Sequence, residues 1–155
     1  MALKIVEADY SDEQHAEDIL FLTDQYARDE MGLGETLPNY TKFNLVKELK
    51  KMPVAISFLA YKEGRAVGLA HCFISLSTFQ ARRMITIQDL AVLPEERGEG
   101  IGFEILTAVE SKARELNCCK IILEVRQDNP ARKLYKRFGF EKSSPPMIHM
   151  SKDIY

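Results

Sequence analysis

The sequence predicts a single α/β domain over residues 1–155, with a mixed sheet of about six to seven strands and about four helices on its faces. Two features of the pattern carry this prediction. Strand-like segments follow one another in the middle of the chain, and helix-like and strand-like segments then alternate. The length of 155 residues and the apolar fraction of 46% suit one domain with a substantial core.

The chain opens with one predicted strand and one predicted helix. Residues 3–8 alternate loosely between apolar and polar side chains, as a strand does. Asp9 and Ser11 are suitable N-cap residues for a helix over 12–29. Apolar side chains recur along that helix at helical spacing, namely Ile19, Leu20, Leu22 and Tyr26.

A second helix and three consecutive strands are expected next. Thr41 can cap the helix, which runs to about Lys51, where Pro53 ends it. The period then becomes strand-like in three segments, which are 54–62, 65–77 and 82–92. Lys62-Glu63-Gly64-Arg65 joins the first two of them as a hairpin turn.

The last third of the chain predicts alternating helices and strands. A helix over about 100–117 carries one apolar face, formed by Ile105, Leu106, Val109, Ala113 and Leu116. A buried type of strand at 120–125 and a short helix at 130–138 follow. Two final strands are expected around Phe140 and Ile148.

Composition and charge argue against several kinds of partner. A formal net charge of −2, with both signs mixed along the chain, offers no basic surface to nucleic acid or to an anionic membrane. No apolar run approaches the about 20 residues of a membrane-spanning helix, and the N-terminus has no signal-peptide pattern. The three cysteines, Cys72, Cys118 and Cys119, form no CxxC pair. We therefore expect a cytoplasmic protein without a metal site.

Three glycines at alternate positions, Gly98, Gly100 and Gly102, precede the helix that begins near residue 100. Backbone N–H groups at a helix N-terminus lack partners within the helix and lie at the positive end of its dipole, so they bind phosphate. Glycine removes the β-carbons that would keep a diphosphate away, and Arg97 adds a cation. Close packing of the helix on a strand is the alternative explanation. The spacing matches neither a Walker loop nor the Rossmann fingerprint.

With its neighbouring segments, this loop resembles the central motif of the GNAT superfamily of N-acetyltransferases. The family motif [Q/R]-x-x-G-x-[G/A] corresponds to Arg97-Gly98-Glu99-Gly100-Ile101-Gly102, and LAVLPEERG and NPARKLYKRFGF resemble the flanking signatures. The resemblance covers roughly residues 65–142. It implies a mostly antiparallel sheet whose fourth and fifth strands splay apart, with acetyl-CoA bound between them.

The resemblance also assigns residues to acetyl-CoA. Its pantetheine arm would pair with the backbone of Leu90, Ala91 and Val92. Its diphosphate would lie on a loop formed by Arg97, Gly98, Glu99, Gly100, Ile101, Gly102 and Phe103. Asn129 stands near the family's cofactor-contacting residue, and a helix N-cap ahead of Pro130 explains it equally well. The Asn-to-Tyr spacing is one residue shorter than the commonest family form, which puts Asp128 where that Asn often falls.

Tyr135 stands where the family usually places its general acid, a phenol that protonates the thiolate released from the thioester. An aromatic ring packed under the short helix is the alternative. For the general base, some relatives carry Glu where this chain has Gln88, whose amide cannot accept a proton. Asp89 and His71 are then the candidate bases, reached through a chain of water molecules, and the sequence does not choose between them.

The sequence thus predicts an enzyme that moves an acetyl group from acetyl-CoA to the primary amine of a small molecule. Acidic side chains in the first third of the chain could attract it, namely Asp24, Asp29, Glu30 and Glu35. A pocket between the first helix and the third and fourth strands could hold it, lined by Tyr40, His71, Phe73 and Phe79. A non-catalytic acyl-CoA-binding module and a protein or peptide acetyltransferase remain as alternatives. Neither nucleic acid nor a membrane is expected as a partner, and a homodimer is allowed.

Overall fold

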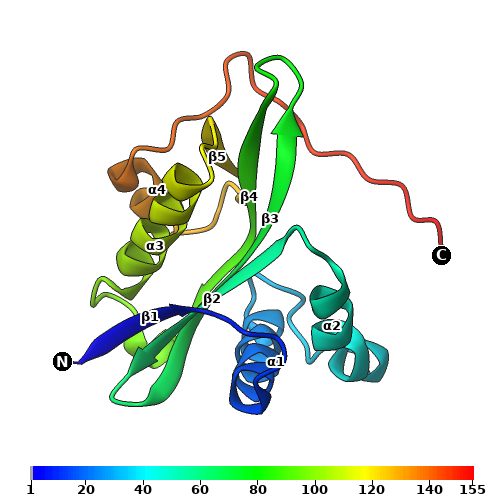
Figure 1. Cartoon of the computed structure of the whole chain (residues 1–155), viewed down its shortest axis with the longest axis vertical. Coiled ribbons are helices and arrows are strands. Elements are labelled where there is room, and N and C mark those ends of the chain that lie inside the picture. The colour runs from blue at the N-terminus through cyan, green and yellow to red at the C-terminus, as the bar shows by residue number, and fades with distance from the viewer. Residues whose placement is uncertain (1) are drawn as a thin grey trace.

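The computed structural model describes residues 2–155 as a five-stranded sheet with helices on both faces (Figure 1). The strands are β1 (Leu3–Glu7), β2 (Ala55–Lys62), β3 (Arg65–Ser77), β4 (Arg82–Val92) and β5 (Lys120–Leu123). The helices are α1 (Glu13–Arg28), α2 (Asn39–Lys51), α3 (Ile101–Glu115) and α4 (Arg132–Phe138), and a 3-10 turn, η1, spans Pro94–Glu96. This arrangement confirms a mixed α/β fold with four helices.

The strands lie in the order β1-β2-β3-β4-β5. Each of the first four is antiparallel to its neighbour, whereas β5 runs parallel to β4. The sheet is therefore mixed and mostly antiparallel. The predicted hairpin turn between β2 and β3 is also confirmed, because Glu63 and Gly64 take the positive φ values of 52° and 78° that such a tight turn requires.

The prediction of six to seven strands is wrong, because the segments around Phe140 and Ile148 form no strand. Residues 141–155 are exposed throughout, and Ile148 keeps 81% of its surface accessible. Pro145 and Pro146 have no N–H to donate to a sheet ladder. An apolar run predicts a strand only where another strand and a core receive it, and this run is not buried against the sheet.

Two helix starts differ from the sequence prediction. Asp12, and neither Asp9 nor Ser11, caps α1, because its carboxylate accepts a hydrogen bond from the backbone N–H of His15. The segment before it is held by another local contact, in which the Ser11 N–H donates to the Asp9 carboxylate. Helix α2 begins at Asn39, directly after Pro38, and so includes the Thr41 that was expected to cap it.

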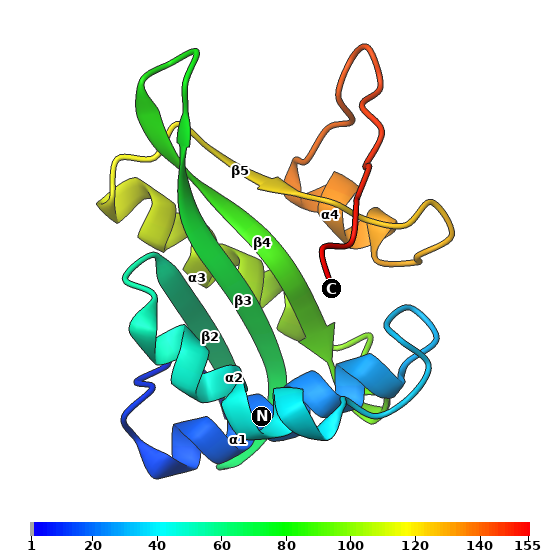
Figure 2. The same ribbon diagram turned by 90° about the vertical axis from the view of Figure 1, so that its right-hand side faces the viewer.

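The core lies on both faces of β3. Helices α1 and α2 cover one face of the sheet, and α3 and α4 lie on the other (Figure 2). Gly68 allows α3 to approach closely, because a β-carbon there would lie 2.9 Å from Cδ1 of Ile105. Along residues 2–155, no helix is both long enough and apolar enough to cross a bilayer.

Strands β4 and β5 diverge, as the resemblance implied. They pair only where Met84–Ile87 meets Lys120–Leu123, although β4 continues to Val92 (Figure 2). Beyond Ile87, the side of β4 that faced β5 therefore has no strand beside it. This opening determines where a ligand can reach the sheet.

Candidate active site

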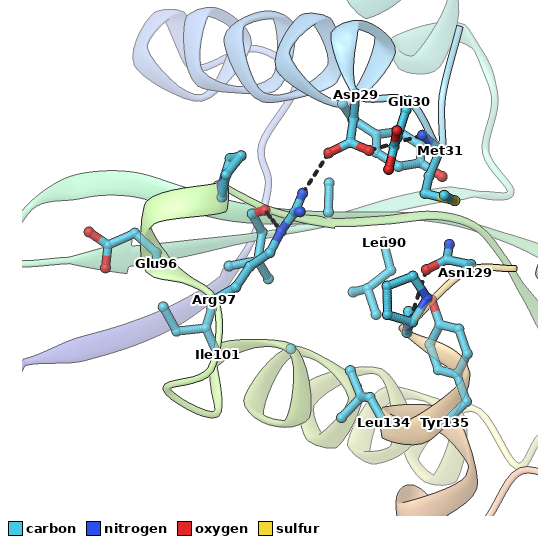
Figure 3. A pocket seen from close by; sticks show the side chains of 17 residues that line it. Asp29, Glu30, Met31, Leu90, Glu96, Arg97, Ile101, Asn129, Leu134 and Tyr135 are labelled. Atoms are coloured by element: carbon cyan, nitrogen blue, oxygen red, sulfur yellow. Dashed lines mark hydrogen bonds and ion pairs between the residues drawn. The ribbon is translucent and has the colours of Figure 1, made fainter. Parts of the chain in front are cut away.

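A pocket of about 530 Å³ lies at the opening between β4 and β5 (Figure 3). Its walls come from the end of α1 with the loop after it, the end of β4, the loop into α3, and the start of α4. Eight of the residues predicted for the site line it, namely Leu90, Ala91, Val92, Arg97, Ile101, Gly102, Asn129 and Tyr135. The remaining predicted site residues, which are His71, Asp89, Gly98, Glu99, Gly100 and Phe103, lie outside this lining.

Gly98 and Gly100 have the backbone geometry that a ligand-binding loop requires. Their φ values are 82° and 85°, in the left-handed region that favours glycine. A β-carbon on either would meet no protein atom within 4 Å, so both face open space. Gly102 is different, because a β-carbon there would lie 2.8 Å from Cδ2 of Leu134 in α4. Close packing thus explains Gly102, and it does not explain the other two glycines.

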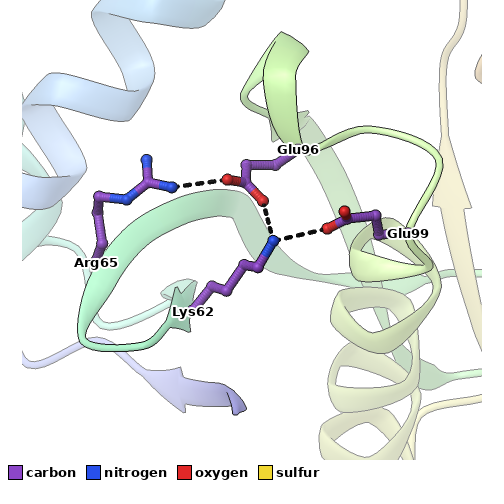
Figure 4. Close-up of polar contacts among 4 residues, drawn as sticks. All are labelled: Lys62, Arg65, Glu96 and Glu99. Carbon is purple, nitrogen blue, oxygen red and sulfur yellow. Dashed lines mark hydrogen bonds and ion pairs between the residues drawn. The ribbon is translucent and has the colours of Figure 1, made fainter. Parts of the chain in front are cut away.

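Four charged side chains anchor this loop to the turn between β2 and β3 (Figure 4). Nζ of Lys62 lies 2.7 Å from Oε2 of Glu96 and 2.9 Å from Oε2 of Glu99. Nη2 of Arg65 lies 2.7 Å from Oε1 of Glu96. The Glu96 carboxyl, which is buried, has a pKa below its usual value because Lys62 and then Arg65 donate hydrogen bonds to it. The Glu99 side chain is therefore engaged with Lys62 through one carboxylate oxygen.

Arg97 is held in place by two acceptors on different elements (Figure 3). Its Nε donates to the carbonyl of Val92 over 2.9 Å, and its Nη2 donates to Oδ2 of Asp29 over 2.9 Å. The pKa of the Asp29 carboxyl lies below its usual value, first because the Met31 N–H donates to it and then because of Arg97. A cation thus stands beside the glycine loop with its carboxylate partner already ionised.

The Tyr135 phenol points into the pocket from α4 (Figure 3). Only 9% of this residue is accessible, and its ring packs edge-on against Phe140 with 5.8 Å between centroids. Burial raises the pKa of the phenol to about 12, with a smaller contribution from Tyr26. The phenol is therefore protonated at neutral pH, as a general acid must be.

Asn129 lies just before α4 and does not cap it. Its Oδ1 accepts a hydrogen bond from the backbone N–H of Ala131 over 2.8 Å, and the helix begins one residue later, at Arg132. The neighbouring Asp128 pairs with Arg126 at 2.9 Å and is exposed. Of these two candidates for the family's cofactor-contacting residue, only Asn129 lines the pocket.

A bulge in β4 determines the direction of Asp89. The cross-strand pairs are His71 with Asp89 and Cys72 with Ile87, so Gln88 has no partner on β3. Asp89 consequently points to the same face of the sheet as His71, towards α1, whereas Ile87 points to the α3 face. Burial raises the pKa of the Asp89 carboxyl to about 6.

His71 is buried in a network of hydroxyl groups. Its Nδ1 lies 2.8 Å from Oγ of Ser57, and its Nε2 lies 3.0 Å from Oγ1 of Thr23. The Ser57 hydroxyl also bonds the Tyr10 hydroxyl over 2.8 Å. Burial lowers the pKa of the imidazole to about 4, so His71 is neutral at physiological pH. Both ring nitrogens already have partners, and neither faces the pocket.

The side chains expected to hold the acceptor are not gathered in one place. Tyr40 is 76% exposed on α2, and Phe79 is fully exposed between β3 and β4, whereas His71 is buried. The pocket wall nearest to α1 comes instead from Tyr26, Asp29, Glu30 and Met31. The sequence analysis named Asp29 and Glu30 as acids that could attract the acceptor, and it gave Tyr26 only as part of the apolar spacing of the helix. Its helical spacing was the only signal, and spacing does not distinguish a pocket wall from a core.

Comparisons with known proteins agree with this geometry. The family model described as "Acetyltransferase (GNAT) family" matches residues 14–140. A putative [ribosomal protein bS18]-alanine N-acetyltransferase of Bacillus subtilis is 30% identical over 103 residues, which are 66% of this chain and 64% of that protein. The match thus spans slightly less than two thirds of this curated relative.

Solved structures show the same fold over nearly the whole chain. A probable acetyltransferase superposes with a TM-score of 0.82 at 21% identity, covering 97% of both chains. The aminoglycoside N-acetyltransferase AAC(6')-Iy, solved in complex with CoA, superposes with a TM-score of 0.78 at 18% identity, covering 99% of this chain and 96% of that one. Since the family model covers most of the sequence, the chain belongs to the GNAT family of acetyltransferases.

Proposed function

We propose that this protein transfers the acetyl group of acetyl-CoA to a primary amine by direct attack of the amine nitrogen on the thioester carbonyl. One observation carries the proposal, namely that Tyr135 and the unpaired end of β4 line the same pocket. An extended chain such as pantetheine can pair with the free backbone groups of an edge strand. A module that only binds acyl-CoA would use the strand and the glycine loop, but it has no need of a buried phenol beside them.

The residues present suit acetyl-CoA in both of its polar parts. Leu90, Ala91 and Val92 offer a strand edge to the pantetheine amides, although the Val92 carbonyl already accepts from Arg97. Gly98 and Gly100 leave open space before the N-terminus of α3, where a diphosphate oxygen can accept backbone hydrogen bonds. Asn129 adds an amide to the opposite wall.

Asp89 is our candidate for the general base. Its carboxyl, with a pKa of about 6, is mostly ionised at neutral pH and is more basic than an ordinary aspartate. Because Asp89 lies outside the pocket lining, it takes the proton of the attacking amine through water, while Tyr135 supplies a proton to the sulfur as the C–S bond breaks. We assign His71 a structural role, because it is buried and both of its ring nitrogens are already bonded.

A small cationic amine is the acceptor that we favour. The exposed Glu30 carboxylate lies at the pocket wall, and Asp89 lies outside the lining on the face of the sheet that α1 covers, so both carboxylates favour the approach of an ammonium group. The structural neighbour that acts on aminoglycosides supports this class of acceptor. The Bacillus subtilis relative, whose name gives a ribosomal protein alanine, makes a peptide N-terminus the second candidate.

The test is mass spectrometry of acceptor mixtures incubated with the protein and acetyl-CoA. The mixture would contain spermidine, amino acids, an aminoglycoside and a peptide that begins with alanine. We expect acetylation of a small amine. Acetylation of the peptide alone would show that the acceptor is a peptide N-terminus and not a small amine, while acetyl transfer to an amine would still be supported. CoA binding without any acetylated product would favour the binding module.

A further inference from the structure

The loop after α1 bridges the two sides of the opening between β4 and β5. On one side, Arg97 of the glycine loop donates to the carboxylate of Asp29 over 2.9 Å. On the other side, Arg126, which follows β5, donates from Nη1 to the carbonyl of Glu30 over 2.9 Å. Figure 3 shows Asp29, Glu30 and Arg97 together at the pocket. Two guanidinium groups from separate elements thus hold one short segment of the pocket wall.

Asp29 organises this segment as well as meeting Arg97. Its Oδ1 accepts from the Met31 N–H over 2.9 Å, and its carbonyl accepts from the N–H groups of Gly32 and Gly34. Its other carboxylate oxygen, Oδ2, is the one that Arg97 bonds. The same side chain therefore shapes the loop with one oxygen and orients the cation with the other.

The contacts of Arg97 leave it free to bind an anion. A guanidinium has donors on three nitrogens, and only Nε and Nη2 are engaged here. Among the described residues, Nη1 has no protein acceptor, and about half of the side chain is exposed. If it bonded Val92 alone, a long and half-exposed side chain would retain much of its rotational freedom. The second bond to Asp29 removes that freedom before any ligand arrives.

We propose that Asp29 is a positioning residue that fixes the Arg97 guanidinium for the diphosphate of CoA and thereby ties the loop 29–34 to the cofactor site. This inference rests on the proposed function, because it takes the glycine loop as the diphosphate site. The negative charge of the Asp29 carboxylate also repels the diphosphate, which weakens CoA binding. Because Asp29 already forms an ion pair with Arg97, we expect the gain from orientation to exceed this repulsion.

The decisive comparison uses one ligand with a diphosphate and one without it. In Asp29→Asn, the amide oxygen can still accept from Met31, while the charge that orients Arg97 is lost. We expect the affinity for CoA to fall about fivefold, within the range of one ordinary hydrogen bond because Asp29→Asn also removes the repulsion between the carboxylate and the diphosphate, and the affinity for pantetheine to stay unchanged. A residue that only shapes the loop would weaken the binding of both ligands alike.

Asp24→Asn is the matched control. Asp24 also forms an ion pair, with Arg28 at 3.0 Å, and it bonds the far end of the same connection through the Leu37 N–H, but it does not contact Arg97. We expect this variant to keep the wild-type ratio of CoA to pantetheine affinity. Calorimetry measures the CoA affinity, and an NMR titration measures the weaker pantetheine affinity.

Arg97 variants separate this inference from the proposed function. We expect Arg97→Gln to weaken CoA binding, and we expect the double variant with Asp29→Asn to be no weaker, because both remove the same interaction. Arg97→Lys keeps the charge but cannot bridge both acceptors, so it should also lose affinity for CoA and not for pantetheine. If Asp29→Asn folds poorly, Arg97→Lys still tests whether the bridge between Val92 and Asp29 matters for CoA binding. Wild-type or tighter CoA binding by Asp29→Asn, with Arg97→Gln impaired, would overturn the role of Asp29 alone. Unimpaired Arg97→Gln would overturn the diphosphate site as well.

Discussion

His71 and Asp89 lie directly opposite each other on β3 and β4, on the face of the sheet that α1 covers. A regular strand would have pointed Asp89 to the other face, alongside Ile87, and the bulge at Gln88 reverses it. Burial reverses the usual order of the two pKa values, raising that of Asp89 to about 6 and lowering that of His71 to about 4. At neutral pH the pair thus holds one carboxylate and one neutral imidazole, which separates their roles.

The first prediction concerns the pH dependence of the reaction. If Asp89 is the base, it must be ionised, so kcat/KM should fall as the pH is lowered through about 6. Asp89→Asn should lower kcat by about 10²-fold and remove this acid limb. Steady-state rates between pH 5 and pH 9 test both statements. A variant that keeps the limb would place the base elsewhere.

Asp89→Asn should also make the protein more stable. In the unfolded chain this carboxyl ionises near its ordinary pKa of 3.8, but in the folded protein it ionises near 6, so between these values the native state binds more protons. Stability is therefore lost as the pH rises through this window, and the full cost remains above it. The shift corresponds to about 3 kcal/mol at most. Urea denaturation at pH 8 should show a gain of that order, whereas at pH 4 the gain should nearly vanish.

In contrast to Asp89→Asn, His71→Ala should lower the stability of the protein and leave its activity nearly unchanged. It removes a buried ring and its two hydrogen bonds with Ser57 and Thr23, so we expect a loss of about 2–4 kcal/mol in the free energy of unfolding. The activity per folded molecule should remain within about threefold of wild type, in contrast with the 10²-fold expected for a general base. Activity measured below the melting temperature, normalised to the folded fraction, distinguishes the two roles.

The same residue affects how wild-type stability depends on pH. The unfolded imidazole takes up a proton near pH 6.5, while the folded one resists protonation down to about pH 4, so His71 costs stability as the pH falls through this window. Asp89 acts in the opposite direction over nearly the same range. The two effects partly cancel in the wild type, and for this reason the single variants reveal more than the intact protein does.

The sequence predicted the elements that local patterns specify. The strand periods, the tight turn at Glu63-Gly64 and the apolar face of α3 all depend on neighbours in the chain. The glycine loop was also predictable, because Gly98 and Gly100 adopt the left-handed conformation that motivated the expectation. The strands expected near Phe140 and Ile148 failed because a strand needs a partner, and no local pattern states whether one is present.

The candidate site was predicted in its residue types and less well in their geometry. The bulge at Gln88 leaves no mark in the sequence, although it decides which face Asp89 occupies. The ion pair between Asp29 and Arg97 joins residues that are 68 positions apart, so it follows from the fold and not from any motif. The role of Tyr26 in the pocket wall likewise depends on how α1 lies over the sheet.

Tyr135→Phe should keep the fold and the CoA affinity but lower kcat by about 10²-fold. The change removes only the hydroxyl, so the ring still packs against Phe140 and a purely structural role would leave the rate unchanged. Tyr26→Phe is the matched control, because Tyr26 lines the same pocket from α1 and also loses only a hydroxyl. Single-turnover rates of both variants, with CoA binding measured in parallel, compare the two phenols. An equal fall in rate in both variants would contradict the assignment of Tyr135 as the general acid.

Gly100→Asn should abolish tight CoA binding without unfolding the protein. Asparagine tolerates the φ of 85° at this position better than other non-glycine residues, at a cost of about 1–2 kcal/mol, so the backbone can persist. Its side chain would enter the open space before α3 where the diphosphate is expected, and we expect the Kd for CoA to rise at least about tenfold. Gly64→Asn is the matched control, since Gly64 has a φ of 78° and also faces open space, but lies in the turn between β2 and β3. Calorimetry with CoA, together with circular dichroism of both variants, separates lost binding from lost structure. A Gly100→Asn protein that is folded and binds CoA as the Gly64→Asn protein does would show that the diphosphate lies elsewhere.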